Sequence, residues 1–106
     1  MKTMIWLSYD LGVQGDYDGL YAWLDAHKAQ ECGDSLAVME YEFSSDLLLE
    51  LKKDLSSHVK LPPRSRIYVI RPDNGSPKGR FVFGSRKSAP WTGYAVVDQE
   101  VEDSEL

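Results

Sequence analysis

The chain has 106 residues, of which 42% are hydrophobic and 11% aromatic, and its 17 acidic and 12 basic residues give a formal net charge of -5. This length suits one domain with a single core, and the hydrophobic fraction excludes a disordered chain. Cys32 is the only cysteine, which excludes an internal disulfide and a cysteine-rich zinc site within one chain. We therefore expect a reducing, cytoplasmic location.

The first predicted element is a buried strand that begins at Met4 and ends at Asp10. Side chains alternate along a strand, so Met4, Trp6, Ser8 and Asp10 lie on one face, and Ile5, Leu7 and Tyr9 lie on the other. The apolar run is too short for a signal-peptide core or a membrane span, so we expect no membrane partner.

A helix and a hairpin are predicted next. Asp16 or Asp18 can cap a helix that ends near His27 or Lys28, because apolar residues recur at helical spacing between them. A short edge strand then leads into a turn at Gly33-Asp34, and the period-two pattern over residues 36–43 predicts its partner strand.

The second half of the chain predicts one more helix and further strands. Ser44-Ser45-Asp46 supplies the cap of a helix that carries Leu48, Leu51 and Leu55 on one stripe and ends before Pro62-Pro63. The remaining predictions are a strand over 66–71, a hairpin arm over 80–83, a loop over 84–90 and a short strand over 94–97. We thus expect one domain over 1–97, with a basic loop insertion at about 72–90 and an acidic tail over 98–106.

This order of elements predicts the fold class α+β, as a ferredoxin-like βαββαβ sandwich with two helices on one face of an antiparallel sheet and a C-terminal strand extension. Right-handed crossovers place both helices on one face and leave the other face open. An open face that carries Met4 and Trp6 predicts a homodimer interface there, and strand extension at the C-terminal end is the alternative mode of dimerisation.

The basic residues are segregated along the chain. Between Lys60 and Lys87, eight basic residues and one acid sum to +7, so the remainder sums to -12. Together with the aromatic residues of the same region, this segment is a candidate nucleic-acid patch, in which the binding residues are Arg64, Arg66, Lys78, Arg80, Arg86 and Lys87. The alternatives are that the aromatic residues Tyr68, Phe81 and Phe83 pack inward, or that the acidic tail covers the patch.

Four features together resemble a known family: the strand that ends in Tyr9-Asp10, the hairpin Cys32-Gly33-Asp34-Ser35, the second helix, and the strand Ile67 to Arg71. They are similar to those of the small ferredoxin-like CRISPR-associated adaptation subunit, of its stand-alone relatives and, more distantly, of VapD-type toxins. The resemblance covers about residues 3–71 by element order, and Trp91-Thr92-Gly93-Tyr94 is a candidate end motif.

The resemblance implies a homodimer that associates with nucleic acid or a defence complex. Several members of that family are metal-dependent nucleases in which the acid that ends the first strand faces its twin in the partner subunit. It therefore implies that Asp10 is the catalytic and metal residue, with Mg²⁺ or Mn²⁺ as the ion.

The residues leave enzyme activity open. The loop after Asp10 carries Asp16 and Asp18 and no basic residue before Lys28, so an incoming phosphate would meet negative charge there. The alternative is a non-catalytic protein-interaction module, such as an antitoxin, immunity or accessory protein, in which Asp10 is a turn residue. His27 and His58 lie near predicted helix ends, and nothing close in sequence indicates that either is a catalytic base.

Overall fold

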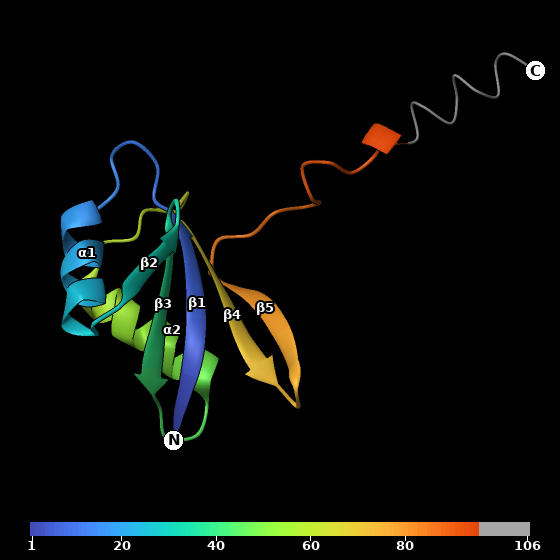
Figure 1. Cartoon of the computed structure of the whole chain (residues 1–106). Helices are drawn as coiled ribbons and strands as arrows, with labels where there is room; N and C mark the ends of the chain where they lie inside the picture. Colours follow the sequence, from blue (N-terminus) through green and yellow to red (C-terminus); the bar gives the residue numbers. More distant parts are fainter. Residues whose placement is uncertain (96–106) are drawn as a thin grey trace, which may run out of the picture.

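The computed structural model describes residues 1–95 and shows a five-stranded antiparallel sheet with two helices (Figure 1). In chain order, the elements are β1 (Lys2–Asp10), α1 (Tyr17–Ala26), β2 (Gln30–Gly33), β3 (Leu36–Glu42), α2 (Leu47–His58), β4 (Arg66–Asp73) and β5 (Ser76–Phe83). The α+β class predicted from the sequence is therefore confirmed. None of the helices within residues 1–95 is long and apolar enough to cross a membrane.

The strands are ordered β2-β3-β1-β4-β5, and each neighbouring pair is antiparallel. The first strand is thus the central one, with β3 on one side and β4 on the other (Figure 1). This arrangement is compatible with a ferredoxin-like sheet to which β5 adds an edge strand.

Both helices cover the same face of the sheet. Ile5 and Leu7 of β1 are fully buried against this layer, because their side chains point toward the helices. The same apolar cluster includes Leu20 of α1 and Leu51 and Leu55 of α2, each fully buried. Figure 1 shows the two helices on one side of the sheet, so neither α1 nor α2 covers the opposite face.

Each helix begins at an aspartate whose side chain accepts a backbone N–H. Asp16 caps α1 by accepting from Gly19 N at 2.9 Å, and Asp46 caps α2 by accepting from Leu49 N at 3.1 Å. Asp16 was one of the two candidate caps, and the other, Asp18, lies in the first turn. Each cap thus gives a hydrogen-bond partner to a backbone N–H of the first turn that has none within the helix.

The hairpin of β4 and β5 differs from the sequence prediction. The predicted hairpin arm over 80–83 is the second half of a strand of eight residues, β5, whose first half was predicted as part of a basic loop. This strand pairs with β4 from Asp73↔Ser76 to Ile67↔Phe83. Asn74 and Gly75 connect the two strands, and both have positive φ, at 54° and 84°. That conformation matches the right-handed twist of a hairpin, so the Asn-Gly pair extends the sheet where a loop was expected.

The short strand predicted over 94–97 is wrong in its described part, because Tyr94 and Ala95 are helical. The other two residues of that prediction, Val96 and Val97, lie outside the described residues. The predicted acidic tail over 98–106 lies outside them as well.

Candidate functional site

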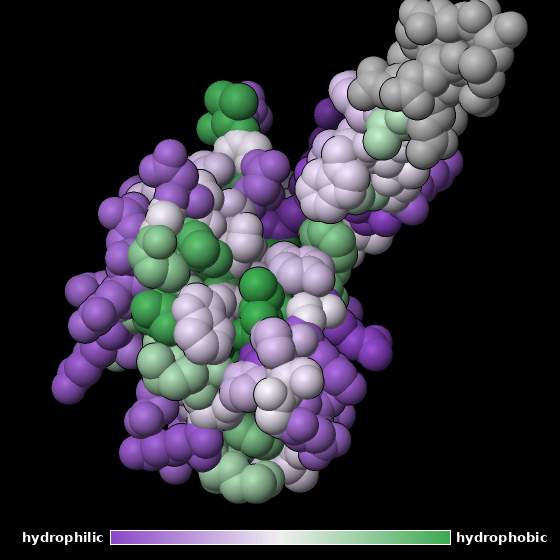
Figure 2. Space-filling view, turned by 45° about the vertical axis from the view of Figure 1, so that its right-hand side comes forward, coloured by the Kyte–Doolittle hydropathy of each residue, from purple (hydrophilic) through white to green (hydrophobic). Residues whose placement is uncertain are grey.

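The sheet face opposite the helices, here called the open face, carries apolar and aromatic side chains. In β1 it presents Met4, 44% exposed, and Trp6, 37% exposed. Trp6 lies between Val38 of β3 and Ile70 of β4 in the strand pairing, so three apolar side chains form one row. Figure 2 shows apolar and pale aromatic side chains in the middle of this face, with hydrophilic side chains around them.

Two aromatic rings extend the open face toward the edge strand. Ser8 of β1 is opposite Tyr68 of β4, and Tyr68 is opposite Phe81 of β5. The Tyr68 and Phe81 rings meet edge to face, with centroids 4.9 Å apart and planes at 80°. Phe81 is 37% exposed and Tyr68 is half-buried, so both rings are accessible. The prediction that these two aromatics pack inward is therefore wrong, whereas Phe83 does pack against the core.

Gly79 makes room for the Tyr68 ring. A Cβ at position 79 would overlap the hydroxyl and ring atoms of Tyr68. The Tyr68 ring therefore lies across the backbone of β5, a position that only a residue without a side chain permits. The Tyr68 ring thus lies over Gly79 and meets the Phe81 ring edge to face.

Asp10 ends β1 at the same end of the open face. Its Oδ1 accepts a hydrogen bond from Gly12 N at 3.1 Å, and Gly12 has a φ of 75°. This is the turn role named as the alternative to metal binding. Asp10 is exposed and opposite Arg66 in the pairing of β1 with β4.

Three of the six predicted nucleic-acid-binding residues gather around Asp10. Arg66 and Arg86 line a hollow of about 240 Å³ together with Asp10, Tyr68 and Phe81. Arg64 and Arg66 line a second hollow, of about 490 Å³, that also includes Asp10. Arginine and aromatic side chains from β4, β5 and the segments beside them thus meet at one end of the open face.

The other three predicted residues are not part of this cluster. Arg80 is opposite the buried Val69, and Lys78 is opposite Arg71, so both side chains belong to the helix-facing side of the sheet. Lys78 also forms an ion pair with Asp73 at 3.3 Å. Lys87 is exposed in the segment that follows β5.

The metal role predicted for Asp10 finds no cluster of further ligands in the part of the chain that the structure describes. Among residues 1–95, no group of three or more His, Cys, Asp or Glu side chains could hold a metal ion. Asp16 is engaged elsewhere, because its carboxylate accepts from Gly19 N and from Lys60 N, each at 2.9 Å. These two N–H groups, that of Lys60 first, hold the pKa of Asp16 below its ordinary value.

The sequence reasoning missed a polar cluster between the helices and β3. Tyr41 donates to Asp54 Oδ2 at 2.8 Å, His58 Nδ1 lies 3.2 Å from Asp54 Oδ1, and His27 Nε2 lies 3.8 Å from Asp54 Oδ2. The spacing of Asp54 and His58 at i,i+4 on α2 was a usable sequence signal. His27 reaches the cluster only through helix packing.

No known protein-family model, curated protein or solved structure matches this chain. The chain is a small α+β protein in which α1 and α2 cover one sheet face and leave the open face uncovered. The resemblance to the CRISPR-associated adaptation subunit rests on the sequence features alone.

Proposed function

We propose that this chain binds a single-stranded nucleic acid on the open face of a ferredoxin-like sheet. Bases stack on Tyr68 and Phe81, and the phosphates pair with Arg64, Arg66 and Arg86. The proposal keeps the nucleic-acid association that the family resemblance implies. It does not require nuclease chemistry.

The observation that carries the proposal is the edge-to-face pair of Tyr68 and Phe81, which is accessible and lines the same hollow as Arg66 and Arg86. Open sheets that bind single strands combine aromatic side chains, on which bases stack, with cationic side chains that follow the backbone. Stacking is tolerant of sequence because every base has a π-face.

The distribution of charge favours a short nucleic-acid binding site at one end of the sheet. Glu40 and Glu42 on β3 are exposed toward the opposite end, where Lys2 pairs with Glu40 at 3.8 Å. The whole chain is acidic, so phosphate is attracted only where the arginines gather. A short single strand beside Asp10 fits this pattern better than a long duplex.

The test is fluorescence anisotropy with labelled single-stranded DNA and RNA 15-mers over a range of salt concentrations. Phe81→Ala and Tyr68→Ala remove stacking surfaces, and each is expected to weaken binding by roughly 5- to 150-fold. Arg66→Gln is expected to reduce the slope of log K against log salt by about 0.7. Arg80→Gln is the matched control, because Arg80 lies in the same hairpin but belongs to the other side of the sheet.

Two results would contradict the proposal. One is the absence of binding at low salt by a folded chain. The other is an equal loss of affinity in Arg80→Gln and Arg66→Gln, because binding would then follow total charge rather than the open face.

A second candidate is self-association through the open face, which would make the chain a protein-interaction module. The exposed Met4 and Trp6, in one row with Val38 and Ile70, favour it. Sedimentation velocity should then report a dimer for the wild type and a monomer for Trp6→Ser. Val13→Ser is the control, because Val13 is fully exposed away from the sheet. A wild-type monomer at high concentration would exclude this candidate.

A further inference from the structure

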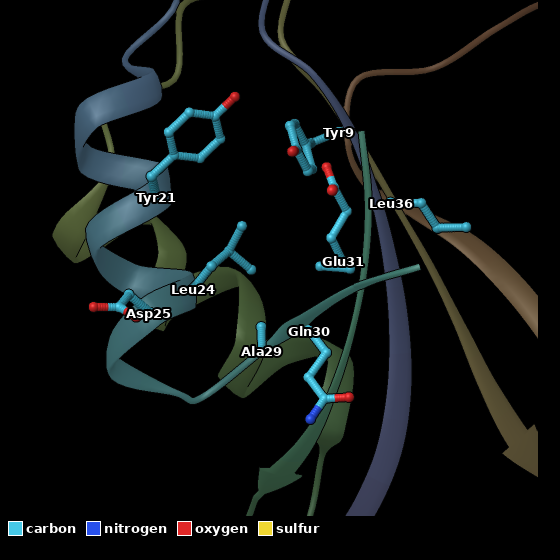
Figure 3. Close-up of a pocket in the computed structure, with 9 residues that line it drawn as sticks. Tyr9, Tyr21, Leu24, Asp25, Ala29, Gln30, Glu31 and Leu36 are labelled. Carbon is cyan, nitrogen blue, oxygen red and sulfur yellow. The ribbon is translucent and has the colours of Figure 1, made fainter. Parts of the chain in front are cut away.

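A hollow of about 400 Å³ opens between α1 and β2, on the helix side of the sheet. Its walls come from four elements: Tyr9 from β1, Tyr21 and Leu24 from α1, Glu31 from β2, and Ala37 from β3. Figure 3 shows Tyr21 on one side of the hollow and Tyr9 with Glu31 on the other, while Leu24 lies between them. This size lies within the range of small-ligand sites.

The two tyrosines form a corner. Their ring centroids are 6.2 Å apart and their planes meet at 76°. Tyr17 supports the corner from behind, with its centroid 5.8 Å from that of Tyr21. Tyr21 is 51% exposed and Tyr9 is half-buried, so the corner is reachable from solvent.

The lining of the hollow is suited to positive charge. Its nine lining residues include two carboxylates, Asp25 and Glu31, and no basic residue. In Figure 3 the Glu31 carboxylate points toward Tyr9, whereas Asp25 points outward at the rim. Burial first, then the Tyr21 hydroxyl and the charge of Glu31, raise the pKa of Tyr9 to about 12. Tyr9 therefore stays neutral at physiological pH and adds no negative charge that a bound group would have to share.

The floor is apolar. Leu24, Ala29 and Ala37 line it, and Leu24 and Ala37 belong to the buried core. An occupant thus meets aliphatic surface below, ring faces at the sides and a carboxylate at the opening. An ammonium on a short alkyl chain meets each of these with a favourable contact, because ring faces and carboxylates both attract cations.

We propose that the hollow between α1 and β2 binds an alkylammonium group, with Tyr9 and Tyr21 around the cation and Glu31 as its counter-ion. The group has two natural sources, a free small amine and a lysine side chain of a peptide. The site lies on the helix side of the sheet. Tyr21 and Glu31 line neither hollow at the arginine cluster, so variants of these two residues test it separately from nucleic-acid binding on the open face.

The test is a titration followed by amide NMR shifts of the full chain, with cadaverine, a blocked Gly-Lys-Gly peptide and its trimethyl-lysine form as probes. 1-Pentanol and blocked Gly-norleucine-Gly are the neutral controls. Saturable shifts in α1 and β2 are expected with the cationic probes. A peptide that binds more tightly than cadaverine identifies a lysine side chain as the source, and equal affinities identify a small amine.

Three variants distinguish binding in this hollow from unspecific attraction of cations to an acidic protein. Glu31→Gln and Tyr21→Leu are each expected to weaken the binding of cationic probes at least fivefold, and both positions are exposed enough for the fold to persist. Glu40→Gln removes an exposed carboxylate on the other face and should change nothing. Equal binding of 1-pentanol and cadaverine, unchanged binding in Glu31→Gln, or no shifts at millimolar cadaverine would each overturn the proposal.

Discussion

The Tyr41 hydroxyl donates a 2.8 Å hydrogen bond to Asp54 Oδ2 and so joins β3 to α2. Tyr41 is buried, and burial first and this carboxylate second raise its pKa. The bond is charge-assisted and fixes the helix at the end of the sheet where β2 no longer pairs with β3.

Tyr41→Phe should therefore lower the free energy of unfolding by about 1–2 kcal/mol, because the ring packing stays while the hydrogen bond to a charged group is lost. Urea unfolding at pH 7 measures the change. Tyr94→Phe, which alters an exposed hydroxyl, is the control. Equal stability of Tyr41→Phe and the wild type would show that Asp54 recovers the lost bond from water.

Gly79→Ala tests the position of the Tyr68 ring. The new methyl group occupies space taken by that ring, so Tyr68 should leave Phe81, and oligonucleotide binding should weaken if both rings act as stacking surfaces. In a Tyr68→Ala background the same change should have no further effect. A double-mutant cycle in anisotropy measures the coupling, and additive effects would contradict the assigned geometry.

Asp10→Asn removes the negative charge of Asp10 but keeps an oxygen for its turn hydrogen bond. Asparagine keeps an oxygen that can accept from Gly12 N, so the fold should be unchanged, and Arg66 is freed from an opposing charge. Oligonucleotide binding should tighten, with the largest gain at low salt. Weaker binding in this variant would count against the arginine cluster as the phosphate site.

The same variant addresses the nuclease expectation. If Mg²⁺ or Mn²⁺ supports hydrolysis of DNA or RNA through Asp10, Asp10→Asn should abolish it while leaving the chain folded. Hydrolysis that is equal in the variant and the wild type would assign the activity to another source.

Acid should destabilise the fold partly by protonating two carboxylates, Asp16 and Glu50, that accept backbone N–H groups at the starts of the helices. Backbone N–H groups hold the pKa of Asp16 below 3.8 and the pKa of Glu50 below 4.5. Their stabilisation is complete above these ordinary values and is lost as pH falls through the lower folded-state pKa values. Asp16→Asn and Glu50→Gln should thus lose less stability than the wild type below pH 4.5, as measured by thermal unfolding across pH. If the stability of the variants and of the wild type fell equally with decreasing pH, Asp16 and Glu50 would not be the groups responsible.

The local features of the fold were predictable from local chemistry. The Asp16 cap followed from helix-start chemistry, and the inward-facing Ile5 and Leu7 followed from the period-two alternation of β1. The Asn74-Gly75 turn was also a local signal, yet it was interpreted as the end of a strand and not as a hairpin. That interpretation limited the predicted hairpin arm to residues 80–83 and left the first half of β5, with Lys78, in a loop.

The α+β class, the central strand with its two faces and the segregation of basic residues were predictable, because they depend on periodicity, element order and composition. Which side chains meet was not predictable, because it depends on strand register and helix packing. Strand register put Tyr68 beside Phe81 and separated Arg80 from Arg66, while helix packing joined Tyr9, Tyr21 and Glu31 from three elements. Register and packing depend on pairings between residues far apart in the chain, which no local pattern encodes.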